Sequence, residues 1–372
     1  MSVKSASIFR LIEEFAPLDQ AESWDNCGLQ LGDAQSEADK AMLTIDVNIT
    51  VAREAVAKGA GLIISHHPLM MKLPKAIDIR QPLGELISYL IRNDITVYAA
   101  HTNLDIAAGG VNSALAGMLG ITNPAVLHQT GLAQLYKLVV FVPMGHEKKV
   151  RDAVLEAGAG WIGNYSHCSF MSSGLGTFKP LAGSNPYYGR EGALEQVEEL
   201  RLETIVPAAV LKKAVKSMLD AHPYEEVAYD VLPLENRGAT FGLGRVGKLA
   251  KPLPLRQFAG AVKEALGLSA VRMGGMSDST VETIAVCGGS GADLWPDALN
   301  AGADTIVTGD VKYHTAQDIT AAGMNFIDAG HYGTESVVLP VLLRYLTGVC
   351  GKTGIDIEFL LSKTNTDPFI YL

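Results

Sequence analysis

The stretch Gly61-Leu62-Ile63-Ile64-Ser65-His66-His67-Pro68 decides how the rest of this sequence is interpreted. Its short apolar run is typical of a buried parallel strand, which Pro68 ends. Ligands of open α/β sheets bind just beyond the carboxyl ends of the strands, where these two histidines lie. Adjacent side chains of a regular strand point to opposite faces, so both imidazoles reach one cavity only if the backbone is irregular. Otherwise one histidine is hydrogen-bonded in the core and the other lies on the surface.

The composition predicts a well-packed globular protein of two or three domains. The chain has 372 residues, of which 48% are hydrophobic and 19% are charged, and its formal net charge is -10. It lacks the Lys/Arg cluster of a nucleic-acid-binding face. No stretch approaches the ~20 apolar residues of a membrane helix, and the first residues lack the apolar run of a secretory signal. The widely spaced Cys27, Cys168, Cys287 and Cys350 fit the reduced thiols of a cytoplasmic protein.

Both outer segments of the chain alternate strands with helices, which predicts an α/β fold with βαβ units and a largely parallel sheet. In the first segment we expect strands at residues 41–47, 61–65 and 95–100, helices at 8–15, 50–58, 83–92 and 111–119, and a shaped loop at 24–32. In the second segment we expect strands at 283–287, 304–308, 325–328 and 355–360, with helices at 254–266, 294–301 and 336–346.

The middle segment, residues 127–235, is predicted to be an inserted α+β domain. We expect a strand at 135–142, a helix at 147–157, two strands of which the second covers 199–205, a helix at 207–221 and a strand at 226–232. This is the ferredoxin-like β-α-β-β-α-β order. Residues 1–126 and 236–372 then form one domain that the insert interrupts.

A weak internal repeat relates the two outer segments. Each has a strand followed by a histidine and, four residues later, an acid: His101 with Asp105, and His331 with Glu335. This spacing places both side chains of a pair on one face of a helix start. The repeat predicts two similar half-domains whose strand ends face one cleft. Alternatively, His331 and Glu335 form an exposed hydrogen-bonded pair at a helix N-terminus, where glutamate is favoured anyway.

Imidazole and carboxylate groups gather after the predicted strands, and this combination suits zinc, iron, manganese or cobalt. Five histidines of the outer segments each follow a strand, namely His66, His67, His101, His314 and His331. With the two acids they could hold two divalent transition-metal ions about 3.5–4 Å apart, which lower the pKa of bound water. His101 and His314 are the candidate proton-transfer groups, but both fit equally well as groups that orient ligands or as ordinary buried histidines.

A glycine run, Gly288-Gly289-Ser290-Gly291, follows one predicted strand and precedes a helix. Backbone N–H groups in such a run can cradle a phosphate. The run is neither a P-loop nor a full dinucleotide-binding fingerprint, so a tight strand-to-helix turn is the favoured interpretation.

Four motifs, in this order, resemble the NIF-three-like dinuclear-metal family, whose bacterial members are commonly labelled GTP cyclohydrolase 1 type 2 homologues. They are Ser65-His66-His67-Pro68, His101-Thr102-Asn103-Leu104-Asp105, Thr308-Gly309-Asp310-Val311-Lys312-Tyr313-His314 and Gly330-His331-Tyr332-Gly333-Thr334-Glu335. Trp24-Asp25-Asn26-Cys27-Gly28-Leu29 is similar to the N-terminal motif of that family. The middle segment resembles the PII/CutA-like insert of its longer members, through Ala221-His222-Pro223-Tyr224-Glu225-Glu226 and the run ending at His167.

The resemblance implies a ligand set, an assembly and an activity. Carried over residue by residue, the metal ligands of the family fall on His66, His67, Asp105, His331 and Glu335. The family also implies a homohexameric ring. We therefore expect a metal-dependent hydrolase of a nucleotide or another phosphorylated small molecule, with His101 or His314 transferring the proton. The alternative is a non-enzymatic metal-binding regulatory or scaffold protein in which the insert is a sensor or gate.

Overall fold

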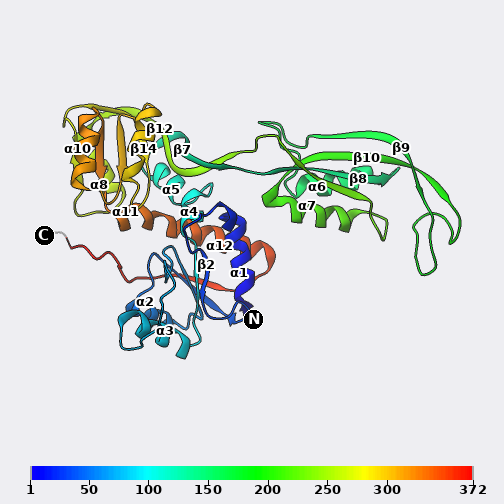
Figure 1. The fold of residues 1–372 in the computed structure, drawn as a ribbon, viewed down its shortest axis with the longest axis horizontal. Coiled ribbons are helices and arrows are strands. Elements are labelled where there is room, and N and C mark those ends of the chain that lie inside the picture. The colour runs from blue at the N-terminus through cyan, green and yellow to red at the C-terminus, as the bar shows by residue number, and fades with distance from the viewer. Residues whose placement is uncertain (1, 371–372) are drawn as a thin grey trace. The chain divides into compact units, whose positions relative to one another are not determined.

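The computed structural model describes residues 2–370 as a mixed α/β fold with several sheets (Figure 1). The chain divides into two compact units. Unit 1 contains the residues up to Gly131 and those from Phe241 onward, and unit 2 contains Leu132–Thr240. No helix within residues 2–370 is long and apolar enough to cross a membrane.

The first sheet of unit 1 has the strand order β17-β4-β5-β6-β2. Its strands are β2 (Gly28–Leu31), β4 (Lys40–Thr44), β5 (Leu62–Ser65), β6 (Thr96–Ala99) and β17 (Glu358–Leu361). The central strands are parallel, and every residue of β5 and β6 is buried, as their continuous apolar runs predict. Strand β2 was expected to be loop. It pairs antiparallel with β6 at the sheet edge, and four residues of mixed polarity give too short a pattern to recognise.

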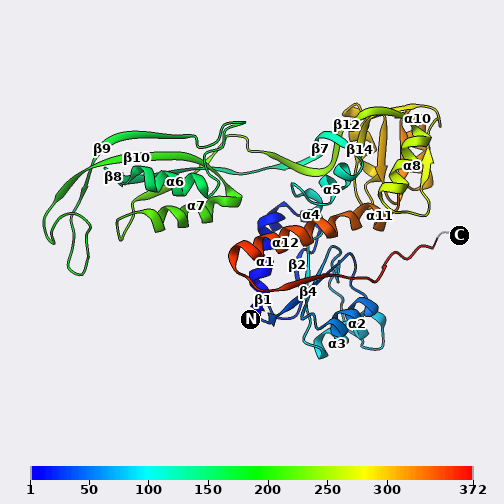
Figure 2. The same ribbon diagram turned by 180° about the vertical axis from the view of Figure 1, so that it is seen from behind.

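Helices cover both faces of this sheet (Figures 1 and 2). Helices α2 (Ile49–Lys58) and α3 (Pro82–Arg92) pack on one face, and α1 (Ser5–Phe15) and α12 (Leu339–Thr353) pack on the other. A short ribbon of β1 (Val3–Lys4) and β3 (Glu37–Ala38) lies beside α1.

The second sheet of unit 1 has the order β13-β16-β15-β14-β12-β7. Its strands are β7 (Ile121–Leu132), β12 (Thr240–Pro254), β13 (Arg272–Gly274), β14 (Thr280–Val286), β15 (Thr305–Thr308) and β16 (Asn325–Asp328). Strands β14, β15 and β16 are parallel. Helices α5 (Val111–Met118) and α8 (Leu255–Ala265) cover one face, and α9 (Trp295–Asn300) and α10 (Tyr313–Ala321) cover the other.

The two sheets exchange elements, and this exchange joins the N-terminal and C-terminal parts of unit 1. Helix α12 and strand β17 come from the C-terminal part, yet they complete the first sheet: Leu342 and Leu346 pack with Leu62 and Tyr98. Helix α5 comes from the N-terminal part, yet its Leu115 packs in the core of the second sheet. Figure 2 shows the C-terminal segment running past β4. Each sheet therefore needs the other part of the chain to bury one of its two faces.

Unit 2 consists of one antiparallel sheet, in the order β11-β8-β10-β9, and two helices. Its elements are β8 (Leu135–Pro143), α6 (Glu147–Glu156), β9 (Ser169–Phe178), β10 (Glu195–Pro207), α7 (Ala208–Ala221) and β11 (Tyr229–Leu234). Alternate residues of β8, such as Val140 and Val142, form a core with Val154 of α6 and Met218 of α7. Both helices therefore lie on the same face of the sheet.

Arg245 joins the two parts of unit 1 through its side chain. It is 6% exposed, and its guanidinium donates to the backbone carbonyls of Gly242, Gly244, Ile106 and Ala107. The last two lie at the end of α4 (Thr102–Ile106) and directly after it.

We predict that Arg245→Ala lowers the free energy of unfolding by about 3 kcal/mol, because four carbonyls lose a charged donor and a cavity forms. Urea unfolding of the full chain measures this change. Arg256→Ala, on the exposed side of α8, is the control and should change stability by less than about 0.5 kcal/mol. Equal stability of the two variants would contradict the joining role of Arg245.

Candidate metal centre

The two histidines of the opening stretch lie directly beyond the carboxyl end of β5. Their backbone N–H groups donate to the carbonyls of Thr44 and Ile45, which continues the pairing with the neighbouring strand. The two rings nevertheless lie near one another, with centroids 5.1 Å apart. His66 is 1% exposed, and the side chain of His67 is 24% exposed. Both imidazoles therefore reach one site.

The structure brings the other three predicted ligands to the same place. Asp105 lies on α4, which follows β6, and its Oδ1 is 3.6 Å from His66 Nε2. His331 and Glu335 begin and end α11 (His331–Glu335), and His331 Nε2 is 3.1 Å from Glu335 Oε1. The other oxygen of Glu335 is 3.0 Å from His67 Nε2. Residues more than 260 positions apart in the sequence thus converge.

A fourth imidazole, His101, also reaches this group. His66, His67 and His101 form one set of potential ligand atoms, and His67, His331 and Glu335 form a second. The two sets share His67. Two neighbouring sets of ligand atoms are compatible with a pair of metal ions.

Each of the four imidazoles has its Nδ1 atom fixed by an acceptor outside the cluster. The partners are Ala100 O for His66 (2.9 Å), Asp46 Oδ1 for His67 (2.7 Å), Asp25 Oδ1 for His101 (2.8 Å) and Asp310 Oδ2 for His331 (2.7 Å). An Nδ1–H that donates to such an acceptor leaves Nε2 with a free lone pair in the neutral ring. This outer hydrogen bond is typical of metal-ligating histidines.

Several inner atoms of the cluster lack a hydrogen-bond partner. Within residues 2–370, the buried side-chain atoms that lack a partner are His66 Nε2, Asp105 Oδ1 and Glu335 Oε2. His67 Nε2 and His331 Nε2 face each other at 3.3 Å. Buried acceptors that converge in this way are unfavourable unless a cation or protons lie between them. The residues therefore fit divalent transition-metal ions held by nitrogen and oxygen.

The electrostatics of the metal-free cluster favour protons on its histidines. Burial alone would lower the pKa of His67, but the carboxylates of Asp46 and Glu335 outweigh it and raise the pKa to about 10. The hydrogen bond to Glu335 raises the pKa of His331 to about 9. Burial raises the pKa of Asp105 to about 6. Without metal, protons therefore take the place of a cation.

A cavity of about 530 Å³ opens onto the cluster. The side chains of His67, His101, Asp105, His331 and Glu335 form its polar wall. Its other walls carry Trp24, Met71, Leu243, Leu294 and Asp293, and no Lys or Arg side chain from residues 2–370 lines it. A small molecule can therefore approach the metal ligands, but no protein cation would neutralise an anionic part of it.

The glycine run after β14 is a tight turn and not a phosphate cradle. Three of its N–H groups are already used: Gly288 donates to Asn112, Gly289 to Thr334 and Gly291 to Thr308. Gly289 has a φ of +63°, and a Cβ there would lie 2.1 Å from Glu335 Oε1. The glycines let the chain approach Glu335 closely.

His314 does not join the cluster. It was expected in a loop after a strand, but it lies exposed in the first turn of α10, where its Nδ1 is 3.3 Å from Gln317 Oε1. It does not line the cavity at the metal centre. Of the two candidate proton-transfer groups, the structure places only His101 at the cluster.

Sequence reasoning missed the residues that fix the imidazoles. Asp46 follows β4, Asp310 follows β15, and Asp25 precedes β2. A sequence signal was available for Asp46 and Asp310, because each is an acid that lies just beyond the carboxyl end of a strand.

Asn112 was missed as well. It is fully buried, donates to the backbone carbonyl of Asp105 and accepts from Gly288 N–H. It thereby ties together two of the loops that form the site.

A family model described as Duf34/NIF3 (NGG1p interacting factor 3) matches residues 3–368. The chain belongs to this family. A Bacillus subtilis (strain 168) relative named GTP cyclohydrolase 1 type 2 homolog is 44% identical over 371 residues, covering 100% of this chain and 99% of that one. A Bacillus cereus protein related to NIF3 has a solved structure that matches at a TM-score of 0.89, with 43% identity and 99% of each chain covered. A Staphylococcus aureus structure matches at a TM-score of 0.73 and 32% identity, covering 100% of this chain and 99% of its own.

Gly289→Ala is predicted to weaken metal retention in this NIF3-family protein. The new Cβ displaces Glu335, and the left-handed backbone costs about 1–2 kcal/mol for a residue with a side chain. Metal content after dialysis, together with the unfolding midpoint, tests this. Gly117→Ala is the control, because its Cβ meets no atom within 4 Å on helix α5. Full metal retention in Gly289→Ala would contradict the role given to the turn.

The affinity for a divalent metal ion is predicted to rise with pH up to about 9. The pKa values of His67 and His331 lie above 7 in the metal-free cluster, so a metal ion must displace protons at neutral pH. Affinity then increases by up to roughly tenfold per pH unit for each proton displaced. Competition with a chelator at pH 6, 7 and 8 measures this. An affinity that does not change between pH 6 and 8 would show that no proton is displaced.

Proposed function

We propose that this protein is a dinuclear metal-dependent hydrolase that acts on a nucleotide or another phosphorylated small molecule. The observation that carries the proposal is the convergence of four anchored imidazoles with the carboxylates of Asp105 and Glu335 beside one cavity, whose wall carries three of these imidazoles and both carboxylates. The name GTP cyclohydrolase 1 type 2 homolog, which the curated relatives carry, supports this class of substrate.

In this proposal His66, His67, Asp105, His331 and Glu335 hold two divalent ions of zinc, iron, manganese or cobalt. Such ions supply Lewis acidity and a bound water of lowered pKa. Asp46 and Asp310 hold the rings of His67 and His331 in the orientation that ligation needs.

His101 is the proposed proton-transfer residue. The carboxylate of Asp25 accepts from its Nδ1, so a proton moves on and off at Nε2, which faces the cluster. His101 and neighbouring groups that donate hydrogen bonds to Asp25 hold the pKa of that carboxyl below its usual range, although its burial opposes them. Asp25 therefore stays ionised and keeps His101 in one tautomer.

Metal analysis of the purified protein is the first test. We expect close to two transition-metal ions per chain, and less than half of that content in the His67→Ala, Glu335→Ala double variant. His314→Ala is the matched control and should keep all its metal, because His314 lies outside the cluster. Retention of more than half the metal by the double variant would overturn the ligand assignment.

A screen of the metal-loaded protein against GTP, other nucleotides and phosphorylated metabolites, followed by mass spectrometry, tests the reaction. We expect His101→Gln to lose at least roughly 100-fold in turnover, the usual contribution of a positioned proton-transfer group, and to keep its metal. Loss of the metal together with turnover would make His101 a ligand instead.

A non-enzymatic role is the second candidate, and the lining of the cavity favours it. Three aspartates and no Lys or Arg from the described residues line the space where a phosphate would approach. The protein would then be a metal-binding regulatory or scaffold protein, with the insert as its sensor or gate. Absence of turnover in the screen, together with ligand binding by unit 2, supports this candidate.

We further propose that the outer segments are two related half-domains and that the middle segment is a PII/CutA-like insert of the NIF3 domain. The strand order β11-β8-β10-β9 with two helices on one face supports a ferredoxin-like insert.

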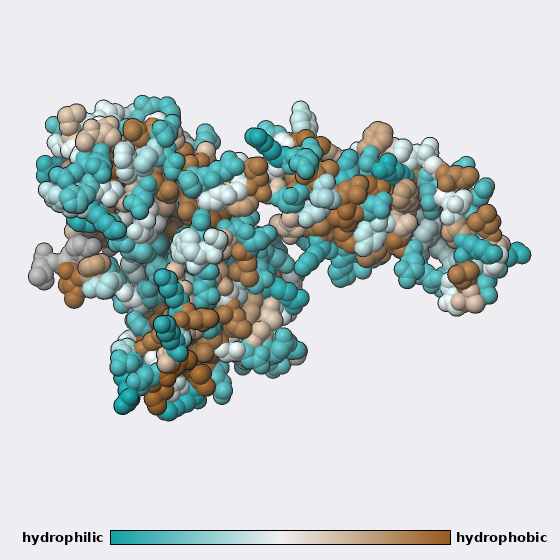
Figure 3. Space-filling model, in the orientation of Figure 1, coloured by the Kyte–Doolittle hydropathy of each residue, from teal (hydrophilic) through white to brown (hydrophobic). Residues whose placement is uncertain are grey.

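A cytoplasmic homohexamer is also proposed. Figure 3 shows apolar residues gathered over the part of unit 1 that contains α2 and α3. The exposed apolar side chains between β5 and the end of α3 are Met71, Leu73, Ile77, Ile79, Leu83 and Ile91. Such a surface supports contact between subunits.

A further inference from the structure

Unit 2 contains a second cavity, of about 440 Å³, that the metal chemistry does not use. The cavity and the two helices lie on opposite faces of the sheet, because successive side chains of β8 point to opposite faces. Val140 and Val142 join the helix-facing core, whereas Phe141 between them lines the cavity. The segment that follows β9 forms another wall. This segment is fixed where Asn185 N–H donates to the carboxylate of Glu225 at 2.8 Å.

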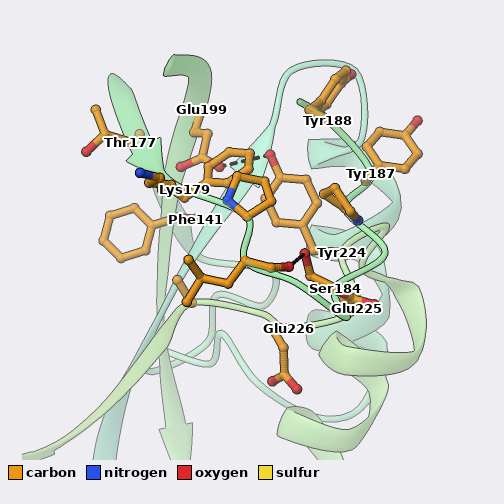
Figure 4. A pocket seen from close by; sticks show the side chains of 16 residues that line it. Phe141, Thr177, Lys179, Ser184, Tyr187, Tyr188, Glu199, Tyr224, Glu225 and Glu226 are labelled. Carbon is orange, nitrogen blue, oxygen red and sulfur yellow. Dashed lines mark hydrogen bonds between the residues drawn. The ribbon is translucent and has the colours of Figure 1, made fainter. Parts of the chain in front are cut away.

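A buried carboxylate lies at this cavity. Glu199 is 9% exposed, and the hydroxyl of Tyr224 donates to its Oε1 at 3.0 Å (Figure 4). No lysine, arginine or histidine from residues 2–370 forms an ion pair with it. A Cβ on Gly176 would lie 2.2 Å from Glu199 Oε2, so the glycine provides the space that this oxygen occupies. A buried carboxylate with only a neutral partner is unfavourable, and a cation would stabilise it.

Aromatic rings line the same cavity as this carboxylate. Figure 4 shows Tyr224 in the middle of the pocket, with Tyr187 and Tyr188 on one side and Phe141 on the other. The ring centroid of Tyr224 lies 6.1 Å from that of Tyr187 and 6.4 Å from that of Tyr188. The faces of such rings attract cations, and their apolar bodies remove water from an alkyl chain.

The charges of the lining disfavour an anionic ligand. Three glutamates, Glu199, Glu225 and Glu226, line the cavity with one lysine, Lys179. Phosphate groups would meet like charges and a single exposed cation. A positively charged head near Glu199, with an apolar chain among the tyrosines, matches both features of the lining.

We propose that unit 2 binds a small organic cation that has N–H donors, a guanidinium or primary ammonium group on an apolar chain. Glu199 accepts hydrogen bonds from the charged head, and Tyr187, Tyr188 and Tyr224 contact the chain. The site is independent of the proposed hydrolase activity.

Calorimetric titration of the full chain with agmatine tests the proposal, since agmatine carries both head groups on a four-carbon chain. We expect saturable binding of one agmatine per chain, and weaker binding of tetramethylammonium, which has no N–H donor. Glu199→Gln should weaken agmatine binding on the order of tenfold or more. Tyr188→Leu should weaken it about threefold, because the ring face is lost while apolar bulk remains.

Glu198→Gln is the matched control, because Glu198 is the exposed neighbour of Glu199 on β10 and does not line the cavity. Glutamine at position 199 can still accept from Tyr224, so the variant should fold, and its unfolding midpoint checks this. The proposal is overturned if agmatine gives no saturable binding, if Glu199→Gln and Glu198→Gln bind it equally, or if ATP binds unit 2 more tightly than agmatine.

Discussion

The exchange of elements between the two sheets of unit 1 is the constraint on which the candidate metal centre depends. Helix α12 and strand β17 complete the first sheet, and α5 completes the core of the second. Because each sheet buries the apolar side chains of one face against an element of the other part, the loops beyond β5 and β6 are fixed relative to α11. That fixed geometry brings His67 within 3.0 Å of Glu335. Separate folding of the two parts would leave each with an incomplete ligand set.

Hydrogen bonds around the cluster then fix the orientation of the ligand side chains on this backbone. Asp46, Asp25 and Asp310 each hold one imidazole through Nδ1, and a backbone carbonyl holds the fourth. These partners direct four Nε2 atoms into a buried space that contains carboxylates. These converging acceptors require a cation or protons between them, and the raised pKa values of His67 and His331 have the same cause.

The cavity at the candidate metal centre and the cavity lined by Glu199 share an acidic lining but differ in the groups that balance it. At the candidate metal centre, anchored imidazoles accompany Asp105 and Glu335, which suits metal ions. In unit 2, tyrosine rings accompany Glu199, which suits an organic cation. In both proposals a carboxylate is the group that a cation would stabilise, and the neighbouring side chains decide which kind of cation fits.

The sequence by itself determined the buried strands β5 and β6 and the histidines at their ends, because continuous apolar runs followed by polar residues need no distant partner to be recognised. The ordered histidine and carboxylate motifs of the sequence were also enough to recognise the family. Only the tertiary structure decided that His101 reaches the cluster while His314 does not, and that Asp46, Asp25 and Asp310 fix the rings. It also decided that β7, β12 and α10 form, none of which the pattern predicted. The physical reason is that an isolated aspartate or an edge strand carries no local sign of its partner, since that partner is distant in the sequence and comes close only when the strands pair into their sheets.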